Sequence, residues 1–207
     1  MKRLEREPQI PESTDEEVFQ SYVEDLRLVP EDFDKKIIDI GAGSTKFAKW
    51  AKEHGISREI YSLEPQEESI LEKNKSVTAL AEAIPFENGS FDLVISRAAI
   101  PNVYEGEVNT ETVREKVINS LSEMVRITRP GGEVRLSRVL IQQEHKPQYV
   151  LPPDIEEALE SLKEKYDVEI EKIRIPSDDI YQRENHQLIK LLAESYLIII
   201  RKPIKDE

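Results

Sequence analysis

The chain's clearest structural signal is the stretch Lys36-Ile37-Ile38-Asp39-Ile40-Gly41-Ala42-Gly43-Ser44-Thr45-Lys46-Phe47. Its apolar β-branched residues predict a short buried strand that contains an acidic residue near its end. The glycines that follow have no Cβ, so the backbone can turn tightly and pass close to a ligand. A helix starting at Ser44 would point its free N–H groups and its positive dipole end back at this turn. The stretch therefore predicts a nucleotide-sized pocket at the carboxyl end of a parallel sheet.

Strand and helix patterns alternate along the rest of the chain and predict a doubly wound α/β fold. We expect a mostly parallel seven-stranded sheet with an antiparallel last strand, its strands at 37–40, 60–63, 76–80, 91–96, 133–141, 168–175 and 195–201. Five helices are expected. The first starts at about residue 14 and ends by Pro30, the next three span 44–54, 65–74 and 110–127, and the last starts at Pro153. A turn is expected at 129–132, and a loop of irregular and helical residues between the last two strands. Residues 1–13 are predicted to be a flexible tail, and 14–207 a single domain with an N-terminal cap helix.

Composition excludes several classes of protein. The chain has 207 residues, 38% of them hydrophobic, which is enough for one domain with a sizeable core. There is no apolar run long enough to span a membrane and no secretory signal, so we expect a cytoplasmic protein without a membrane partner. No cysteine is present, which excludes disulfides and thiolate chemistry. The formal net charge of −13 and the lack of a basic cluster argue against a nucleic-acid partner.

Spacing separates the ligand classes that use glycine-rich turns. A P-loop has the pattern Gly-x-x-x-x-Gly-Lys-Ser/Thr, but no glycine directly precedes Lys46. A dinucleotide fingerprint has the pattern Gly-x-Gly-x-x-Gly. Gly41 and Gly43 match it, but Lys46 occupies the third position, where a long side chain would crowd the packing of helix on strand. A nicotinamide-dependent oxidoreductase is therefore a weaker alternative.

Four motifs, in order, resemble those of the class I S-adenosylmethionine-dependent methyltransferases. They are Asp39-Ile40-Gly41-Ala42-Gly43, Tyr61-Ser62-Leu63-Glu64-Pro65, Ala81-Glu82-Ala83-Ile84-Pro85-Phe86-Glu87-Asn88-Gly89-Ser90-Phe91-Asp92-Leu93-Val94 and Arg129-Pro130-Gly131-Gly132-Glu133. The resemblance extends over about residues 35–140. It implies a Rossmann-like methyltransferase fold, S-adenosylmethionine as the cofactor, and methyl transfer to a small-molecule acceptor. A non-catalytic protein that binds the same cofactor on the same fold is the main alternative.

The resemblance also implies a set of cofactor-binding residues, namely Asp39, Gly41, Ala42, Gly43, Glu64, Pro65, Ala81, Glu82, Ser96 and Arg97. Glu64 would accept hydrogen bonds from both ribose hydroxyls, which are strong because the acceptor is charged. Asp39 would fix the glycine turn or meet the ammonium group of the cofactor. Two positions depart from the family pattern. Leu80 stands where an acidic residue often accepts from the adenine amino group, and Thr45 stands where glycine is common.

The acceptor is expected over the carboxyl ends of the fourth and fifth strands. Methyl transfer from a sulfonium is an in-line displacement, so the protein mainly aligns and desolvates the reactants. A general base is needed only where the attacking atom must lose a proton. The catalytic residue is not identified by the sequence, and the weak candidates are Arg97, Tyr104, His145 and His186. The histidines lack metal-ligand spacing, and no metal is expected.

Further side chains are expected near the acceptor. Asn102 and Arg138 lie at the same strand ends, and we hypothesise that Arg97 and Arg138 hold a carboxylate or phosphate of an anionic acceptor. Salt bridges within the protein are the alternative explanation for these arginines. Phe19 and Tyr22 on the N-terminal helix are expected either to cover the pocket or to pack against the sheet. The sequence does not indicate an oligomeric state.

Overall fold

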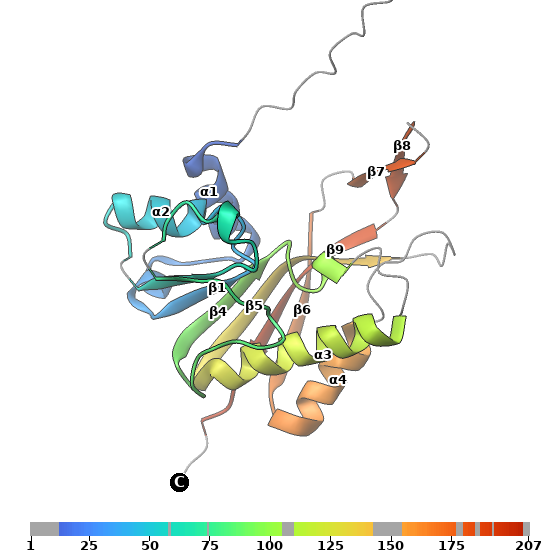
Figure 1. The fold of residues 1–207 in the computed structure, drawn as a ribbon. Helices are drawn as coiled ribbons and strands as arrows, with labels where there is room; N and C mark the ends of the chain where they lie inside the picture. The colour runs from blue at the N-terminus through green and yellow to red at the C-terminus, as the bar shows by residue number, and fades with distance from the viewer. Residues whose placement is uncertain are drawn as a thin grey trace, which may run out of the picture.

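In the computed structural model, a seven-stranded sheet separates two layers of helices (Figure 1). The structure describes residues 13–57, 59–73, 75–104, 110–142, 155–176, 180–184, 187–191 and 193–204. In spatial order the strands are β3 (Ser76–Val77), β2 (Ile60–Leu63), β1 (Ile37–Ile40), β4 (Phe91–Arg97), β5 (Thr128–Gln142), β9 (Ala193–Arg201) and β6 (Glu169–Ile175). The first five run parallel, and β9 runs antiparallel to both β5 and β6. This arrangement confirms the predicted fold class.

The two faces of the sheet carry separate hydrophobic clusters. Helices α3 (Thr110–Ile127) and α4 (Ile155–Tyr166) cover one face, and α1 (Asp15–Asp25) and α2 (Lys46–Glu53) cover the other (Figure 1). All four residues of β1 are buried between them, as expected for a central parallel strand. Among the described residues, no helix is both long and apolar enough to cross a membrane.

Helix α1 starts where its capping residues predict. The Thr14 hydroxyl accepts from the Glu17 N–H (3.2 Å), and the Glu17 carboxylate accepts in return from the Thr14 N–H (2.8 Å). This reciprocal pair is a capping box, which satisfies donors that the first turn leaves free. The Tyr22 ring stacks on Phe47 of α2, with ring centroids 4.4 Å apart. Helix α1 is thus packed against α2, with its Tyr22 next to Asp39 of β1.

Three expectations about local structure are wrong. Residues 65–74 do not form a helix, because only the 3-10 turn η2 (Glu67–Ser69) is helical among those described. The strand expected at 76–80 ends at Val77. The loop expected between the last strands contains the hairpin of β7 (Ile180–Glu184) and β8 (Gln187–Leu191), which projects from the sheet (Figure 1). The predicted tail lies outside the described residues, except for Ser13.

A buried ion pair fixes the chain that leads from α1 to β1. In the 3-10 turn η1 (Pro30–Asp34), the Asp32 side chain is 1% exposed and accepts from Arg135 of β5 at 2.8 and 3.3 Å. Lys35 donates to the same carboxylate at 2.7 Å, and the backbone N–H of Val29 donates at 3.0 Å. These donors hold the pKa of Asp32 below its usual value against the opposing effect of burial. Arg135 also donates to the carbonyl of Arg27, so it ties the end of α1 to the sheet.

Replacing Asp32 with alanine is therefore expected to destabilise the fold. The Asp32→Ala substitution removes a buried carboxylate that accepts from Arg135, Lys35 and the Val29 N–H. Because Arg135 keeps Glu133 as an acceptor at 2.7 Å, the expected loss is that of buried donors left unsatisfied, about 1–3 kcal/mol in the free energy of unfolding. Urea denaturation followed by circular dichroism measures this loss. The control is Asp34→Ala in the same turn, where the side chain is exposed and the change should stay within about 0.5 kcal/mol. Equal effects of the two substitutions would refute the role given to Asp32.

Candidate functional site

A buried carboxyl group lies at the centre of the candidate site. Asp39 of β1 pairs in register with Ser62 of β2 and Ile95 of β4, and it is 1% exposed. The Tyr22 hydroxyl of α1 makes a hydrogen bond with this carboxyl group. The Oδ1 atom of Asp39 has no hydrogen-bond partner among the described residues. A buried acceptor without a partner is costly, so this oxygen is suited to a donor that a ligand brings.

Burial also changes the protonation of Asp39. Removal from water raises the pKa of Asp39 to about 7, a rise that the nearby Glu64 carboxylate reinforces. The Tyr22 hydrogen bond and the Arg97 charge oppose it. Burial, followed by the proximity of Asp39, also raises the pKa of Tyr22 well above its usual value, so Tyr22 remains a hydroxyl donor. A positive charge next to Oδ1 would favour the ionised carboxylate and lower the pKa of Asp39.

The glycine turn that follows β1 is shaped by two different constraints. Gly41 has φ +73°, and a Cβ placed there would lie 2.5 Å from the Ala99 Cβ, so packing alone requires glycine. Gly43 has φ +53°, yet a Cβ there would meet no described atom within 4 Å. The N–H groups of Gly41 and Ala42 donate to the Leu63 carbonyl at 2.8 and 3.2 Å, which ties the turn to β2. The space over Gly43 is therefore open at the place where a ligand could approach the backbone.

The conformation and contacts of Thr45 explain how a threonine fits at a position where the motif commonly has glycine. Its φ of +57° lies in the left-handed region, which is unusual for a β-branched residue and natural for glycine. The Thr45 hydroxyl accepts from the Glu72 N–H at 2.9 Å, an interaction that glycine could not make. The threonine thus adopts a backbone conformation that glycine adopts readily, and it ties the start of α2 to the β2–β3 connection.

Glu64, directly after β2, turns its carboxylate across the glycine turn. Its Oε2 accepts from the Gly43 N–H at 2.9 Å and its Oε1 from the Gln66 N–H at 3.2 Å. Glu64 is 8% exposed, so it faces the protein and not bulk water. Each carboxylate oxygen can accept more than one hydrogen bond, so capacity remains for the hydroxyls of a ribose. The next predicted residue, Pro65, is exposed.

The segment expected to contact adenine is anchored to α3. Ala81 is buried and Glu82 is half-buried at the end of the β3 connection. Just beyond them, the Ile84 N–H donates to Glu123 at 3.0 Å, and Arg126 donates to the Ile84 carbonyl at 2.9 Å. The Leu80 side chain is 59% exposed, so an apolar surface stands where the family often has a carboxylate. An adenine at this position would meet apolar surface and backbone groups, with Glu82 as the nearby carboxylate.

The ends of β4 and β5 carry the residues expected near an acceptor. Ser96 is fully buried, and its hydroxyl accepts from the Ile100 N–H at 3.1 Å, which shapes the turn after β4. Arg97 Nε and Arg138 Nε both donate to Oδ2 of Asp25, at 2.7 and 2.6 Å. The Arg97 guanidinium also lies over the Tyr22 ring, 5.4 Å from its centroid. The two arginines are therefore brought together, and a carboxylate of α1 lies between them.

The remaining candidates lie elsewhere or outside the described residues. Tyr104 is buried, and its hydroxyl lies 2.8 Å from the Ser120 hydroxyl of α3, so it faces the helical layer opposite α1. Asn102 donates to the Arg138 carbonyl at 2.8 Å and supports the strand end. His145 and His186 fall outside the residues that the structure describes. Over the described ranges, no group of three potential metal-ligating side chains is found.

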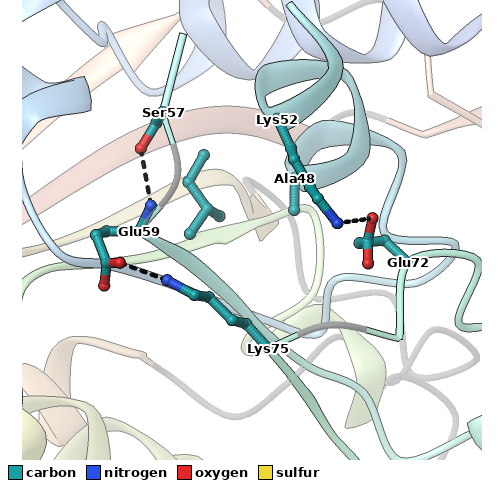
Figure 2. A pocket seen from close by; sticks show the side chains of 7 residues that line it. Ala48, Lys52, Ser57, Glu59, Glu72 and Lys75 are labelled. Atoms are coloured by element: carbon teal, nitrogen blue, oxygen red, sulfur yellow. Dashed lines mark hydrogen bonds and ion pairs between the residues drawn. The ribbon is translucent and has the colours of Figure 1, made fainter. Parts of the chain in front are cut away.

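A cavity of about 420 Å³ lies beside the start of β2, away from Glu64 (Figure 2). Ala48 and Lys52 of α2 and Ile60 of β2 are among the residues that line it. Ion pairs of Lys52 with Glu72 (2.8 Å) and of Lys75 with Glu59 (2.5 Å) border it. None of the residues that line this cavity was predicted to contact the cofactor, so it is separate from the site at the glycine turn.

Sequence reasoning missed the residue that organises the acceptor side. Asp25 ends α1 and carries no recognisable motif, and its two arginine partners lie 72 and 113 residues away. The signal that was available is indirect. A carboxylate at the C-terminal end of a helix is disfavoured by the helix dipole, so it calls for a cationic partner.

Comparisons with known proteins agree with this geometry. Residues 38–136 match the family model described as a methyltransferase domain. No curated protein sequence matches the chain. The YcgJ protein of Bacillus subtilis is 15% identical, with a TM-score of 0.59 over 88% of this chain and 99% of that one. An S-adenosylmethionine-dependent methyltransferase of Methanosarcina mazei is 15% identical, with a TM-score of 0.53 over 84% and 94% of the two chains.

Another similar structure is the [4+2]-cyclase SpnF, 13% identical with a TM-score of 0.60 over 91% of this chain and 82% of that one. At these identities the structural likeness establishes the fold, and the reactions of the neighbours differ. The family match extends over the glycine turn, Glu64 and the end of β4, and it stops within β5, before Arg138. Residues 38–136 are therefore similar to a methyltransferase domain, the chain has the fold of solved methyltransferases, and this similarity implies S-adenosylmethionine as the cofactor.

Proposed function

We propose that this protein transfers the methyl group of S-adenosylmethionine to a small-molecule acceptor bound over the ends of β4 and β5. The observation that carries the proposal is the pairing of two carboxyl groups around one open glycine turn. Asp39 has an unpartnered buried oxygen, and Glu64 holds its carboxylate against the Gly43 N–H at 2.9 Å. An ammonium group and a ribose, joined through one ligand, would satisfy both.

The residues present fit this cofactor, and each has a definable role. When bound, the cofactor supplies a methyl group already activated on a sulfonium. Asp39 would hold the ammonium group, Glu64 would accept from the ribose hydroxyls, and the turn at Gly43 would leave room for the chain between them. Tyr22, stacked on Phe47, would exclude water from the methionine end. The protein's contribution is alignment and desolvation, which suits a displacement that needs no strong acid or base.

The charge of the protein favours a small molecule over a nucleic acid as the methyl acceptor. The net charge of −13 repels nucleic acid over long distances. The arginines at the candidate acceptor position are neutralised in part by Asp25, so they do not form an extended basic surface. Binding of S-adenosylmethionine without turnover across a panel of acceptors would instead favour the alternative of a non-catalytic binding protein.

The first test is cofactor binding and its dependence on Glu64. Calorimetric titration with S-adenosylhomocysteine should show binding, and Glu64→Gln should weaken it by about 10–100-fold. The loss of a hydrogen bond to a charged group is worth about 1.5–3 kcal/mol, which corresponds to that factor. Glu67→Gln in η2 is the matched control, because Glu67 is exposed and should not alter affinity. Absence of binding by the unaltered protein would overturn the proposed function.

The two glycines should respond differently to alanine. At Gly43 the new Cβ points into open space, so the fold should lose only the cost of a left-handed alanine, about 1–2 kcal/mol. Affinity for S-adenosylhomocysteine should nevertheless fall at least about tenfold, because the Cβ occupies space that we assign to the ligand. Gly41→Ala adds a clash with Ala99 and should destabilise the fold more strongly. Thermal denaturation with and without ligand separates the two effects. Unchanged affinity in Gly43→Ala would place the cofactor elsewhere.

Binding should also release a proton from Asp39. With its pKa near 7, Asp39 is mostly protonated at pH 6, and the ligand's ammonium group favours the ionised form. Affinity should therefore rise as pH increases from 5 to 7, with up to about one proton released per ligand at pH 6. Titration calorimetry in two buffers of different ionisation enthalpy measures that number. Asp39→Asn should release none, and equal proton release by this variant would exclude Asp39 as the source.

A further inference from the structure

The acceptor side contains a carboxylate site that is filled by the protein's own side chain. Asp25 ends α1, Arg97 ends β4, and Arg138 lies in an irregular part of β5 between Leu136 and Val139. Both guanidinium groups reach the same atom, Asp25 Oδ2, through Nε at 2.7 and 2.6 Å. Arginine binds a carboxylate in a defined geometry, so this arrangement shows that the arginine pair can bind a carboxylate.

The backbone holds both arginines at the strand ends. Arg138 has φ +55°, a left-handed conformation that interrupts the β5–β9 ladder, and Asn102 donates to its carbonyl at 2.8 Å. Irregularities of this kind re-aim a side chain at the edge of a sheet. Arg97 is followed by Ala98, which is also left-handed at φ +54°. The positions of the arginines are therefore set by the sheet, independently of Asp25.

Arg97 keeps hydrogen-bond donors beyond the one that Asp25 uses. Among the described residues, Asp25 is the hydrogen-bond acceptor of Arg97, and only Nε is used. Ser137, the register partner of Arg97 on β5, has a fully buried hydroxyl without a partner in the described part of the chain. A second anion could therefore be accommodated.

Asp25 itself is an unfavourable permanent occupant. It is the last residue of α1, where the negative end of the helix dipole disfavours a carboxylate, and no basic residue lies in that last turn. Its side chain is 13% exposed, so a competing anion can approach from the solvent side. The site also adjoins the cofactor residues, since the Arg97 charge affects the pKa of Asp39 and its guanidinium lies over Tyr22.

We propose that Arg97 and Arg138 bind a carboxylate of the methyl acceptor, and that Asp25 is an internal stand-in which this carboxylate displaces. The inference rests on the proposed function and names its substrate class, a small carboxylic acid. Acceptor binding then releases Asp25 from Arg97 and Arg138, while Arg135 still ties the end of α1 to β5 and Tyr22 still connects α1 to Asp39. Asp25 thus acts as a specificity device, because an uncharged acceptor cannot compete with it for the arginines.

The test follows the Nε–H signals of Arg97 and Arg138 by NMR, with the protein saturated with S-adenosylhomocysteine. Benzoate and hexanoate are titrated, with benzamide and hexanamide as uncharged counterparts. Asp25→Asn keeps the side-chain shape but weakens the internal competitor, so it should tighten acid binding by about tenfold, or about 1.4 kcal/mol. Amide binding should not change. Glu24→Gln, an exposed neighbour on the same helix, is the matched control and should leave acid binding unaltered.

The double variant Asp25→Asn/Arg97→Gln should not show the tighter acid binding of Asp25→Asn. This result would assign the tighter binding to the arginine pair. The proposal is overturned if acids do not shift the arginine signals of Asp25→Asn up to their solubility limit. It is also overturned if Asp25→Asn and Glu24→Gln change acid binding equally. The Gly43 amide signal reports S-adenosylhomocysteine binding in the same spectra. Failure of the cofactor to bind is therefore distinguished from failure of the carboxylate site.

Discussion

The burial of Asp39 beneath α1 is the constraint on which the rest of the site depends. A carboxyl group at the end of a central strand would be solvated if α1 were absent, and it would then be an ordinary ionised aspartate. With α1 in place it is 1% exposed, shares a hydrogen bond with Tyr22 and keeps one oxygen unpartnered. The energetic cost of that oxygen is offset by the packing of Tyr22 on Phe47, which links α1 to α2. A ligand that brings a cationic donor would relieve this cost, so the buried carboxyl favours occupancy.

The same helix connects the cofactor side to the acceptor side. Tyr22 and Asp25 are three residues apart and therefore lie on one face of α1. Tyr22 contacts the end of β1, and Asp25 contacts the ends of β4 and β5. Movement of α1 would therefore alter the surroundings of Asp39 and of the arginine pair together. The arginine that links the end of α1 to the sheet, Arg135, lies deeper and is paired with buried Asp32, so the chain leaving α1 stays anchored.

The sequence predicted those parts of the fold that depend on local pattern. The first two strands and the helix at 110–127 have the expected bounds, because their apolar periodicity matches their burial. The helix expected at 65–74 rested on Pro65 alone, which fits the first turn of a helix. Ile70 is buried and Leu71 is 57% exposed, so the apolar stripe that a packed helix needs is missing. The β7–β8 hairpin was overlooked, because the residues between its strands, Asn185 and His186, are not one of the glycine-containing pairs that mark a two-residue hairpin in a sequence.

The residues of the candidate site also fall into those that the sequence predicted and those that it did not. Asp39, Gly41, Gly43 and Glu64 belong to two short motifs, and strand pairing brings these motifs together without further information. Arg97 and Arg138 were expected near the acceptor, but their shared partner Asp25 comes from an N-terminal helix that the family match at 38–136 does not include. The cyclase SpnF shows that this fold also accommodates a different reaction. In this chain the candidate cofactor residues come from two short motifs, whereas the candidate acceptor residues are joined by contacts distant in sequence. In this chain, Asp25 with its two arginines is where substrate choice would be determined, because it is the charged contact that joins the helix above the site to the strands below it.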